Sequence, residues 1–193
     1  MPPTMTVVAG PPGSGKSTAF PVSGFGAASF NADDRAAVLN GGSYTGISKQ
    51  IREQVNREYA EFVIDCVNRR ESFAIETTLR SQVTFEQARL AKSSGFRIEM
   101  RYLALNRFSM HLERVKARAD VGGHSASGAV LRRIHDASLG NLLRAVEDMD
   151  LLWIYDNSRF GGPLKLVMET KAGKIVFLED PPPAWLARTF GWV

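Results

Sequence analysis

The hydrophobic positions of the chain follow two patterns, short continuous apolar runs and longer stretches with one apolar residue every three or four positions. The short runs are rich in β-branched residues and end at glycine or at polar residues, which is typical of buried parallel strands. We predict five such strands, within residues 4–10, 27–34, 72–78, 96–105 and 151–156.

The longer stretches predict amphipathic helices between these strands. The first helix starts at Ile47, and its apolar face consists of Ile51, Val55, Tyr59, Phe62 and Cys66. A second is expected over residues 83–95, and two more within residues 107–150, around a break at Gly122 and Gly123. Residues 163–180 predict a β-hairpin that turns at "KAGK", and residues 181–193 a packed surface segment.

This alternation of strands and helices predicts a three-layer α/β fold with a mainly parallel five-stranded sheet, followed by the C-terminal β-hairpin. A chain of 193 residues has the usual length of one domain. We therefore expect residues 1–193 to form a single domain.

The composition is that of an ordinary soluble protein, with 44% hydrophobic and 23% charged residues. Cys66 is the only cysteine, which excludes an internal disulfide and a cysteine zinc cluster. The first residues have no basic segment followed by an apolar core, so we expect no signal peptide. No apolar window approaches the length of a membrane span. The cytoplasm is the expected compartment.

The formal net charge of +4 is distributed unevenly. Residues 89–144 contain eleven Lys and Arg against four Asp and Glu, so the rest of the chain has a net charge of −3. A basic middle segment in an otherwise acidic chain suggests an anionic ligand there. A solvated cationic face is the alternative.

The segment "GPPGSGKST" at residues 10–18 directly follows the first predicted strand and matches the Walker A pattern. Its glycines let backbone N–H groups surround phosphate oxygens, and the following helix presents its positive end to them. Lys16 is expected to bridge the outer phosphates, and Ser17 to ligate Mg²⁺. Pro11 and Pro12 lack N–H groups, so the donors start at Gly13. The expected nucleotide-binding residues of this loop are Gly10, Pro11, Pro12, Gly13, Ser14, Gly15, Lys16, Ser17 and Thr18.

Two further predicted strands end in carboxylates, "FNADD" and "FAIETT". Ligands gather at the carboxyl ends of parallel strands, so these acids should face the phosphates. Asp33 is the candidate base that accepts a proton from an attacking hydroxyl, and Asp34 is assigned to capping the next helix. Two acidic strand ends, the second at Glu76, favour phosphate transfer to a small acceptor over a mechanical ATPase.

The basic segment provides candidate phosphate contacts. His111, Arg114 and Arg118 share one face of a predicted helix, and Arg132 and Arg133 follow the glycine break. We predict that these four arginines close over the transferring phosphate.

The remaining candidates are two histidines and the end of the fifth strand. His111 and His135 are predicted to be helix-surface residues, and the histidine spacing predicts no zinc site. Asp156 and Asn157 end the fifth strand, where they either line the nucleotide base pocket or form a turn.

Several motifs together resemble the zeta toxin family of P-loop kinases: "VVAGPPGSGKST", "FNADD", "AIETTL", "HLERVKARADVGGH", "LRRIHDASLGNL" and "IYDNS". The resemblance extends from residue 5 to about residue 177. It implies ATP- or GTP-dependent, Mg²⁺-requiring phosphorylation of a hydroxyl of UDP-N-acetylglucosamine, and an antitoxin partner.

By position, the resemblance implies a role for each matching residue. Asp33 corresponds to the base, Lys16 and Ser17 to the phosphate and magnesium contacts, and Arg114 to a contact of the transferring phosphate. The acceptor-binding residues are then Glu76, Thr77 and Thr78, and His124 is a further expected substrate contact.

Three alternatives remain. A polynucleotide kinase would suit the basic segment, but its cations are not interleaved with exposed aromatic residues that could stack bases, so nucleic acid is the less favoured partner. An antibiotic kinase would differ only in its acceptor. A non-catalytic ATP-binding switch would bind nucleotide without turnover, and His124 and Ser127, which depart from the family pattern, favour it.

Overall fold

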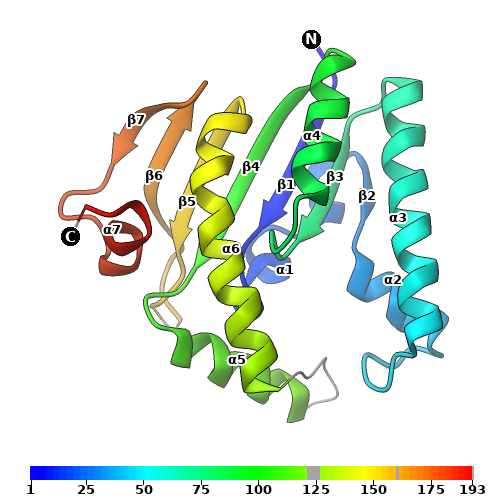
Figure 1. Ribbon diagram of the computed structural model, residues 1–193, viewed down its shortest axis with the longest axis horizontal. Helices are drawn as coiled ribbons and strands as arrows, with labels where there is room; N and C mark the ends of the chain where they lie inside the picture. Colours follow the sequence, from blue (N-terminus) through cyan, green and yellow to red (C-terminus); the bar gives the residue numbers. More distant parts are fainter. Residues whose placement is uncertain (121–126, 160, 193) are drawn as a thin grey trace.

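The central element of the fold is a seven-stranded sheet with the strand order β2-β3-β1-β4-β5-β6-β7 (Figure 1). The computed structural model describes residues 1–120, 127–159 and 161–192. Strands β2, β3, β1, β4 and β5 are parallel, and β6 and β7 are antiparallel. The strands are β1 Thr4–Ala9, β2 Ala28–Phe30, β3 Phe73–Thr77, β4 Arg97–Ala104, β5 Leu151–Asp156, β6 Lys165–Lys171 and β7 Lys174–Leu178.

The predicted parallel sheet and the C-terminal hairpin are confirmed. The hairpin turns between Lys171 and Lys174, and it extends the parallel sheet because β6 pairs with β5. The helical elements are α1 Lys16–Ala19, the 3-10 helix η1 Val22–Phe25, α2 Ala32–Leu39, α3 Lys49–Arg69, α4 Val83–Ser93, α5 Phe108–Asp120, α6 Gly128–Asp148 and α7 Ala184–Phe190.

Helix starts follow the local capping chemistry. The helix predicted from Ile47 begins at Lys49, because the Ser48 hydroxyl accepts a hydrogen bond from the Ile51 amide at 3.2 Å. The segment predicted as two helices forms α5 and α6, and the Ser127 hydroxyl caps α6. None of the helices in the described ranges has the length and apolar character needed to cross a membrane.

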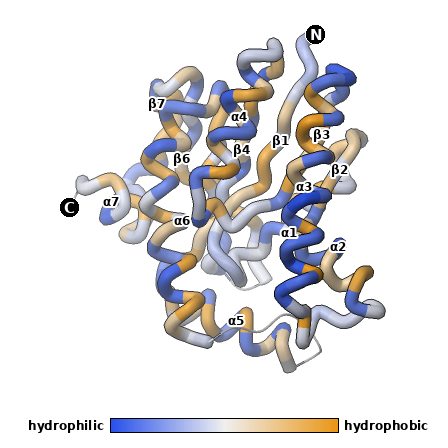
Figure 2. The backbone as a smooth tube through the Cα atoms, turned by 45° about the vertical axis from the view of Figure 1, so that its right-hand side comes forward, coloured by the Kyte–Doolittle hydropathy of each residue, from blue (hydrophilic) through white to orange (hydrophobic). Residues whose placement is uncertain are grey.

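The hydrophobic core lies on one face of the sheet, under α3, α4 and α6 (Figure 1). Alternate residues of β4, namely Ile98, Met100 and Tyr102, are fully buried there. Figure 2 shows the corresponding hydrophobic stretches along the central strands. The packing on this face fixes the register of the parallel strands and hence the positions of their carboxyl ends.

The opposite face of the sheet has a much thinner cover, made by α1 and η1 over a small cluster of Val8, Val22 and Ala74. Here β4 presents Arg101, whose guanidinium lies 4.8 Å from the ring centre of Trp153 and 4.9 Å from that of Phe25. Stacked cation–π contacts of this kind replace the aliphatic packing of the first face.

Candidate active site

The loop between β1 and α1 is shaped by glycines in backbone conformations that other residues rarely adopt. Gly10, Gly13 and Gly15 have positive φ angles of 142°, 76° and 91°. A Cβ atom on Gly10 would lie 2.1 Å from the carbonyl oxygen of Leu103, and one on Gly13 would lie 2.6 Å from that of His111. The loop is therefore pressed against the end of β4 and the start of α5.

The helix after the loop is a single turn, Lys16–Ala19. Phe20 leaves the helical conformation because the residue before a proline avoids the α region, and Pro21 follows. A single turn has a small dipole, so anion binding here must depend on the loop amides and on cationic side chains more than on a helix end.

Lys16 is almost completely buried, with 7% of its surface exposed. Its Nζ atom donates to the carbonyl oxygens of Gly10, at 2.9 Å, and Pro11, at 3.3 Å. Burial lowers the pKa of Lys16, while the charges of Glu76 and Asp33 raise it and that of Arg118 lowers it further. A phosphate anion beside the ammonium would favour its charged form.

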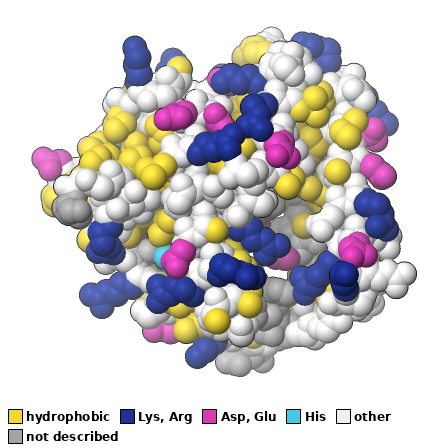
Figure 3. Space-filling view, in the orientation of Figure 1, with side chains coloured by type: hydrophobic (Ala, Val, Ile, Leu, Met, Phe, Trp, Pro, Cys, Tyr) yellow, Lys and Arg dark blue, Asp and Glu magenta, His cyan; other side chains and the backbone are white. Residues whose placement is uncertain are grey.

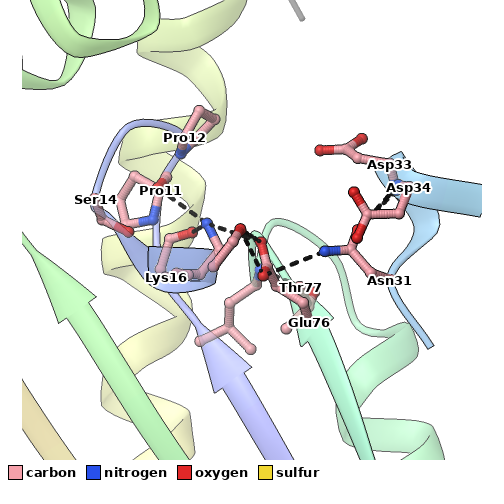
Figure 4. Close-up of polar contacts among 12 residues, drawn as sticks. Pro11, Pro12, Ser14, Lys16, Asn31, Asp33, Asp34, Glu76 and Thr77 are labelled. Atoms are coloured by element: carbon pink, nitrogen blue, oxygen red, sulfur yellow. Dashed lines mark hydrogen bonds and ion pairs between the residues drawn. The ribbon is translucent and has the colours of Figure 1, made fainter. Parts of the chain in front are cut away.

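The carboxylate of Glu76 lies between Lys16 and Asn31 (Figure 4), and it also contacts the Walker A serine. Ser17 Oγ donates to Glu76 Oε2 at 2.9 Å, and Lys16 Nζ lies 3.9 Å from Glu76 Oε1. Asn31 Nδ2 donates to the same carboxylate at 3.4 Å. Glu76 reaches this position because β3 pairs with β1, so the ends of the two strands are neighbours.

The oxygens of Ser17 and Glu76 suit Mg²⁺, which prefers hard oxygen ligands and usually takes one or two from the protein. Among the described residues, no cluster of three or more His, Cys, Asp or Glu side chains could hold a metal ion. A magnesium ion at Ser17 and Glu76 would therefore share its coordination with phosphate oxygens and water.

The start of α2 carries Asn31, Asp33 and Asp34. The prediction that Asp34 caps this helix is wrong, because the Asn31 side chain accepts hydrogen bonds from the amides of Asp33, at 3.0 Å, and Asp34, at 3.3 Å. Asp34 instead accepts a hydrogen bond from the Tyr44 hydroxyl at 2.9 Å. In Figure 4, Asp33 extends from α2 into the open space across from the phosphate loop.

Helix α5 is connected to the phosphate loop through Arg114 and Asn157. Arg114 Nη2 donates to the Asn157 carbonyl oxygen at 2.8 Å, and Asn157 Nδ2 donates to the Ser14 carbonyl oxygen at 2.9 Å. This places Arg114 and Asn157 beside Gly15, where a Cβ atom would lie 2.4 Å from Asn157 Nδ2. Asn157 thus contacts the loop directly.

The four arginines expected to form one clamp occupy different surroundings. Arg114 adjoins the loop, and the charge of Arg118 acts on Lys16. Arg132 lies with its guanidinium 3.7 Å from the ring centre of Phe108, and Arg133 is exposed on α6. His124 lies outside the described residues.

His111 and His135 were predicted as surface residues, and this prediction is wrong: 2% and 8% of their surfaces are exposed. Their rings lie 5.0 Å apart between α5 and α6. His111 Nε2 accepts from the Leu105 amide at 3.1 Å, which requires Nδ1 to carry the proton and donate to the Pro12 carbonyl oxygen at 3.0 Å. The neutral ring therefore joins the phosphate loop to the β4–α5 connection.

Sequence reasoning missed this role, although His111 shares a helix face with Arg114. Burial lowers the pKa of His111 to about 4, and the charges of His135, Lys16 and Arg114 lower it as well. The hydrogen bond to the Pro12 carbonyl raises the pKa and offsets part of this effect.

The other candidate residues form turns at the same edge of the sheet. Asp156 accepts from the Trp185 indole N–H and from the Ser158 amide, each at 2.7 Å, which agrees with the turn alternative. Thr77 Oγ1 accepts from the Leu79 amide at 3.1 Å and adjoins Thr84, whereas Thr78 is half-buried.

A cavity of about 380 Å³ adjoins Ser17 and Glu76, between η1, β2 and α2. Its walls contain both polar and apolar side chains. The lining residues are Ser17, Pro21, Val22, Ser23, Ser29, Phe30, Asn31, Asp34, Arg35, Val38 and Glu76.

No protein-family model matches the chain. An uncharacterised protein of Haemophilus influenzae is 36% identical over 52 residues, which are 27% of this chain and 37% of that protein. A chain of the AvrRxo1-ORF1:ORF2 complex with ATP is similar with a TM-score of 0.71 and 15% identity, over 99% of this chain and 63% of that chain. The present chain thus spans less than two thirds of either protein.

A structure from the PezAT chromosomal toxin–antitoxin system of Streptococcus pneumoniae is similar with a TM-score of 0.63 and 15% identity, over 98% of this chain and 85% of that chain. These similarities, together with the strand order and the loop after β1, define the fold as that of the P-loop kinases.

Proposed function

We propose that the protein is a Mg²⁺-dependent phosphotransferase that moves the γ-phosphoryl group of ATP or GTP to a hydroxyl of a small acceptor. The observation that carries the proposal is the grouping of Lys16, Ser17 and Glu76 at the ends of β1 and β3. Asp33 stands across the open space from this group (Figure 4). A switch that only bound nucleotide would not need the carboxylate of Asp33.

The residues divide the chemistry between them. The loop amides and Lys16 bind the phosphate chain. Ser17 and Glu76 would hold Mg²⁺, which would neutralise charge on the phosphate oxygens. Asp33 accepts the proton of the acceptor hydroxyl while its oxygen bonds to phosphorus and the bond to the nucleoside diphosphate breaks. Arg114 and Arg118 stabilise the negative charge of the transferring group.

For the acceptor we propose a sugar nucleotide such as UDP-N-acetylglucosamine, with its reacting hydroxyl at the mouth of the cavity beside Glu76. The hydroxyls of Ser23 and Ser29 and the guanidinium of Arg35 support a polar acceptor there. We extend the proposal to a restraining protein partner, because the AvrRxo1-ORF1 structure contains ORF2 and PezAT is a toxin–antitoxin system.

Phosphorus NMR of a reaction with ATP and Mg²⁺, with and without UDP-N-acetylglucosamine, tests the proposal. We expect a new sugar phosphate signal. Its rate of formation should fall by about 10²- to 10⁴-fold in Asp33→Asn, the usual contribution of a general base. Asp65→Asn, an exposed aspartate on α3, is the matched control and should keep the wild-type rate.

The outcomes separate the alternatives. Full activity in Asp33→Asn would remove the base from the mechanism. If UDP-N-acetylglucosamine gives no product, antibiotics and RNA ends are the next acceptors to try. Tight ATP binding without any acceptor-dependent product would identify a nucleotide-binding switch.

A further inference from the structure

The strand at the end of the sheet exposes four consecutive apolar side chains. Ile175, Val176, Phe177 and Leu178 of β7 are 47%, 57%, 40% and 37% exposed. Figure 3 shows hydrophobic side chains gathered on the left of the molecule, where Figure 1 places the hairpin of β6 and β7. Apolar patches of this kind on a soluble protein mark interaction surfaces.

The outer edge of β7 is also unpaired. Within residues 1–120, 127–159 and 161–192, β7 pairs only with β6. An edge without proline or inward-pointing charge is a template for another strand.

The register of β6 and β7 shifts at Val176, and Ile175 and Leu178 therefore oppose Thr170 and Met168, which are both fully buried on the helix-covered face. Both apolar side chains thus point to the same side of the sheet.

The sequence of this strand is complementary to itself when read in the opposite direction. In an antiparallel pair of two copies centred between Val176 and Phe177, Ile175 opposes Leu178. Lys174 then opposes Glu179, the residue directly after the strand. A parallel pair would instead bring like charges together. Glu179 already contacts Lys165 at 2.6 Å, so its carboxylate would lie between this lysine and Lys174 of the other copy.

We propose that β7 pairs antiparallel with β7 of a second copy of this chain, forming a dimer with one continuous sheet. A two-fold axis perpendicular to the sheet keeps the helix-covered faces of both copies on the same side, so that Ile175 of one copy meets Leu178 of the other. The contact is isologous and closes at two copies. The paired segment has only five residues in each copy, so the dimer is weak and its population depends on protein concentration.

Sedimentation velocity over a range of concentrations tests the proposal with a matched pair of variants. Ile175 and Ile64 are almost equally exposed, at 47% and 48%, but Ile64 lies on α3. We expect Ile175→Lys to raise the dissociation constant by at least about a hundredfold, because the two-fold symmetric interface contains the substitution twice and loses apolar burial at both sites. Ile64→Lys should leave it unchanged. Lys174→Glu should also weaken the dimer, by setting two acids against each other.

Hydrogen–deuterium exchange gives an independent readout, because edge amides at residues 174–178 should gain protection as the concentration rises. A wild-type chain that stays monomeric throughout would overturn the proposal, and so would a monomer that instead adds a foreign peptide strand at β7. A dimer that survives Ile175→Lys, or assembly beyond two copies, would place the contact elsewhere.

Discussion

The buried ring of His111 offers the sharpest test of how the phosphate loop is held. His111→Phe keeps an aromatic ring of similar size between α5 and α6 but removes both hydrogen bonds, to Leu105 and to Pro12. Each buried backbone group left unpaired costs about 1–3 kcal/mol, so we expect a loss of roughly 2–6 kcal/mol in the free energy of unfolding. The loop should also become less ordered and bind ATP more weakly.

A second variant separates the two bonds. In His111→Gln, the amide oxygen can replace Nε2 as the acceptor for the Leu105 amide, while the bond to Pro12 is lost. The loss of unfolding free energy should be about half that of His111→Phe, with a similar loss of ATP affinity. His135→Phe is the control, because His135 is buried beside His111 but makes no hydrogen bond to the loop.

Urea unfolding measures the stability of each variant, and isothermal titration calorimetry measures its affinity for ATP. We expect His135→Phe to lose stability but not affinity for ATP, whereas both His111 variants should lose stability and affinity. If His111→Phe unfolds more easily but binds ATP as the wild type does, the contact with Pro12 has no influence on the phosphate loop.

The remaining predictions concern pH and metal. His111 has a pKa of about 4 in the folded protein against 6.5 unperturbed, so the unfolded chain takes up the proton more readily. Stability should therefore fall as the pH drops from about 6.5 towards 4, by about 3 kcal/mol in total, and urea midpoints of wild type and His111→Phe at pH 7 and 5 should reveal it. A wild-type midpoint that does not change would contradict the buried neutral ring. For Glu76→Gln we expect the Mg²⁺ concentration that half-saturates ATP binding to rise by about tenfold or more, because a ligand is lost. Glu61→Gln, on the exposed side of α3, is the control, and an equal Mg²⁺ dependence in both would exclude Glu76 as a ligand.

The sheet and the phosphate loop were accessible from the sequence because their signals are local. Apolar runs that end in glycine or a carboxylate predict buried parallel strands, and the glycine spacing of residues 10–15 predicts the loop. The brevity of α1 also had a local signal, since Pro21 restricts the conformation of Phe20.

The contacts within the site were not accessible in this way, because they depend on which strands are neighbours. The sequence places Ser17 and Glu76 at the same edge of a sheet, but only the pairing of β1 with β3 brings the carboxylate to the hydroxyl. For His111, the polar residue type indicated a surface position, whereas two backbone groups hold the ring inside the protein. At the start of α2, Asp34 was the predicted cap, but the Asn31 side chain accepts the amides of Asp33 and Asp34.

The turn after β5 serves three different parts of the chain with three consecutive residues. Asp156 accepts the indole N–H of Trp185 in α7, Asn157 donates to Ser14 in the phosphate loop, and the Ser158 hydroxyl accepts the amide of Asn106 before α5. Most surface turns tolerate added residues during evolution. A single inserted residue here would misplace at least one of these partners, so the length of this turn is as constrained as that of the nucleotide loop itself.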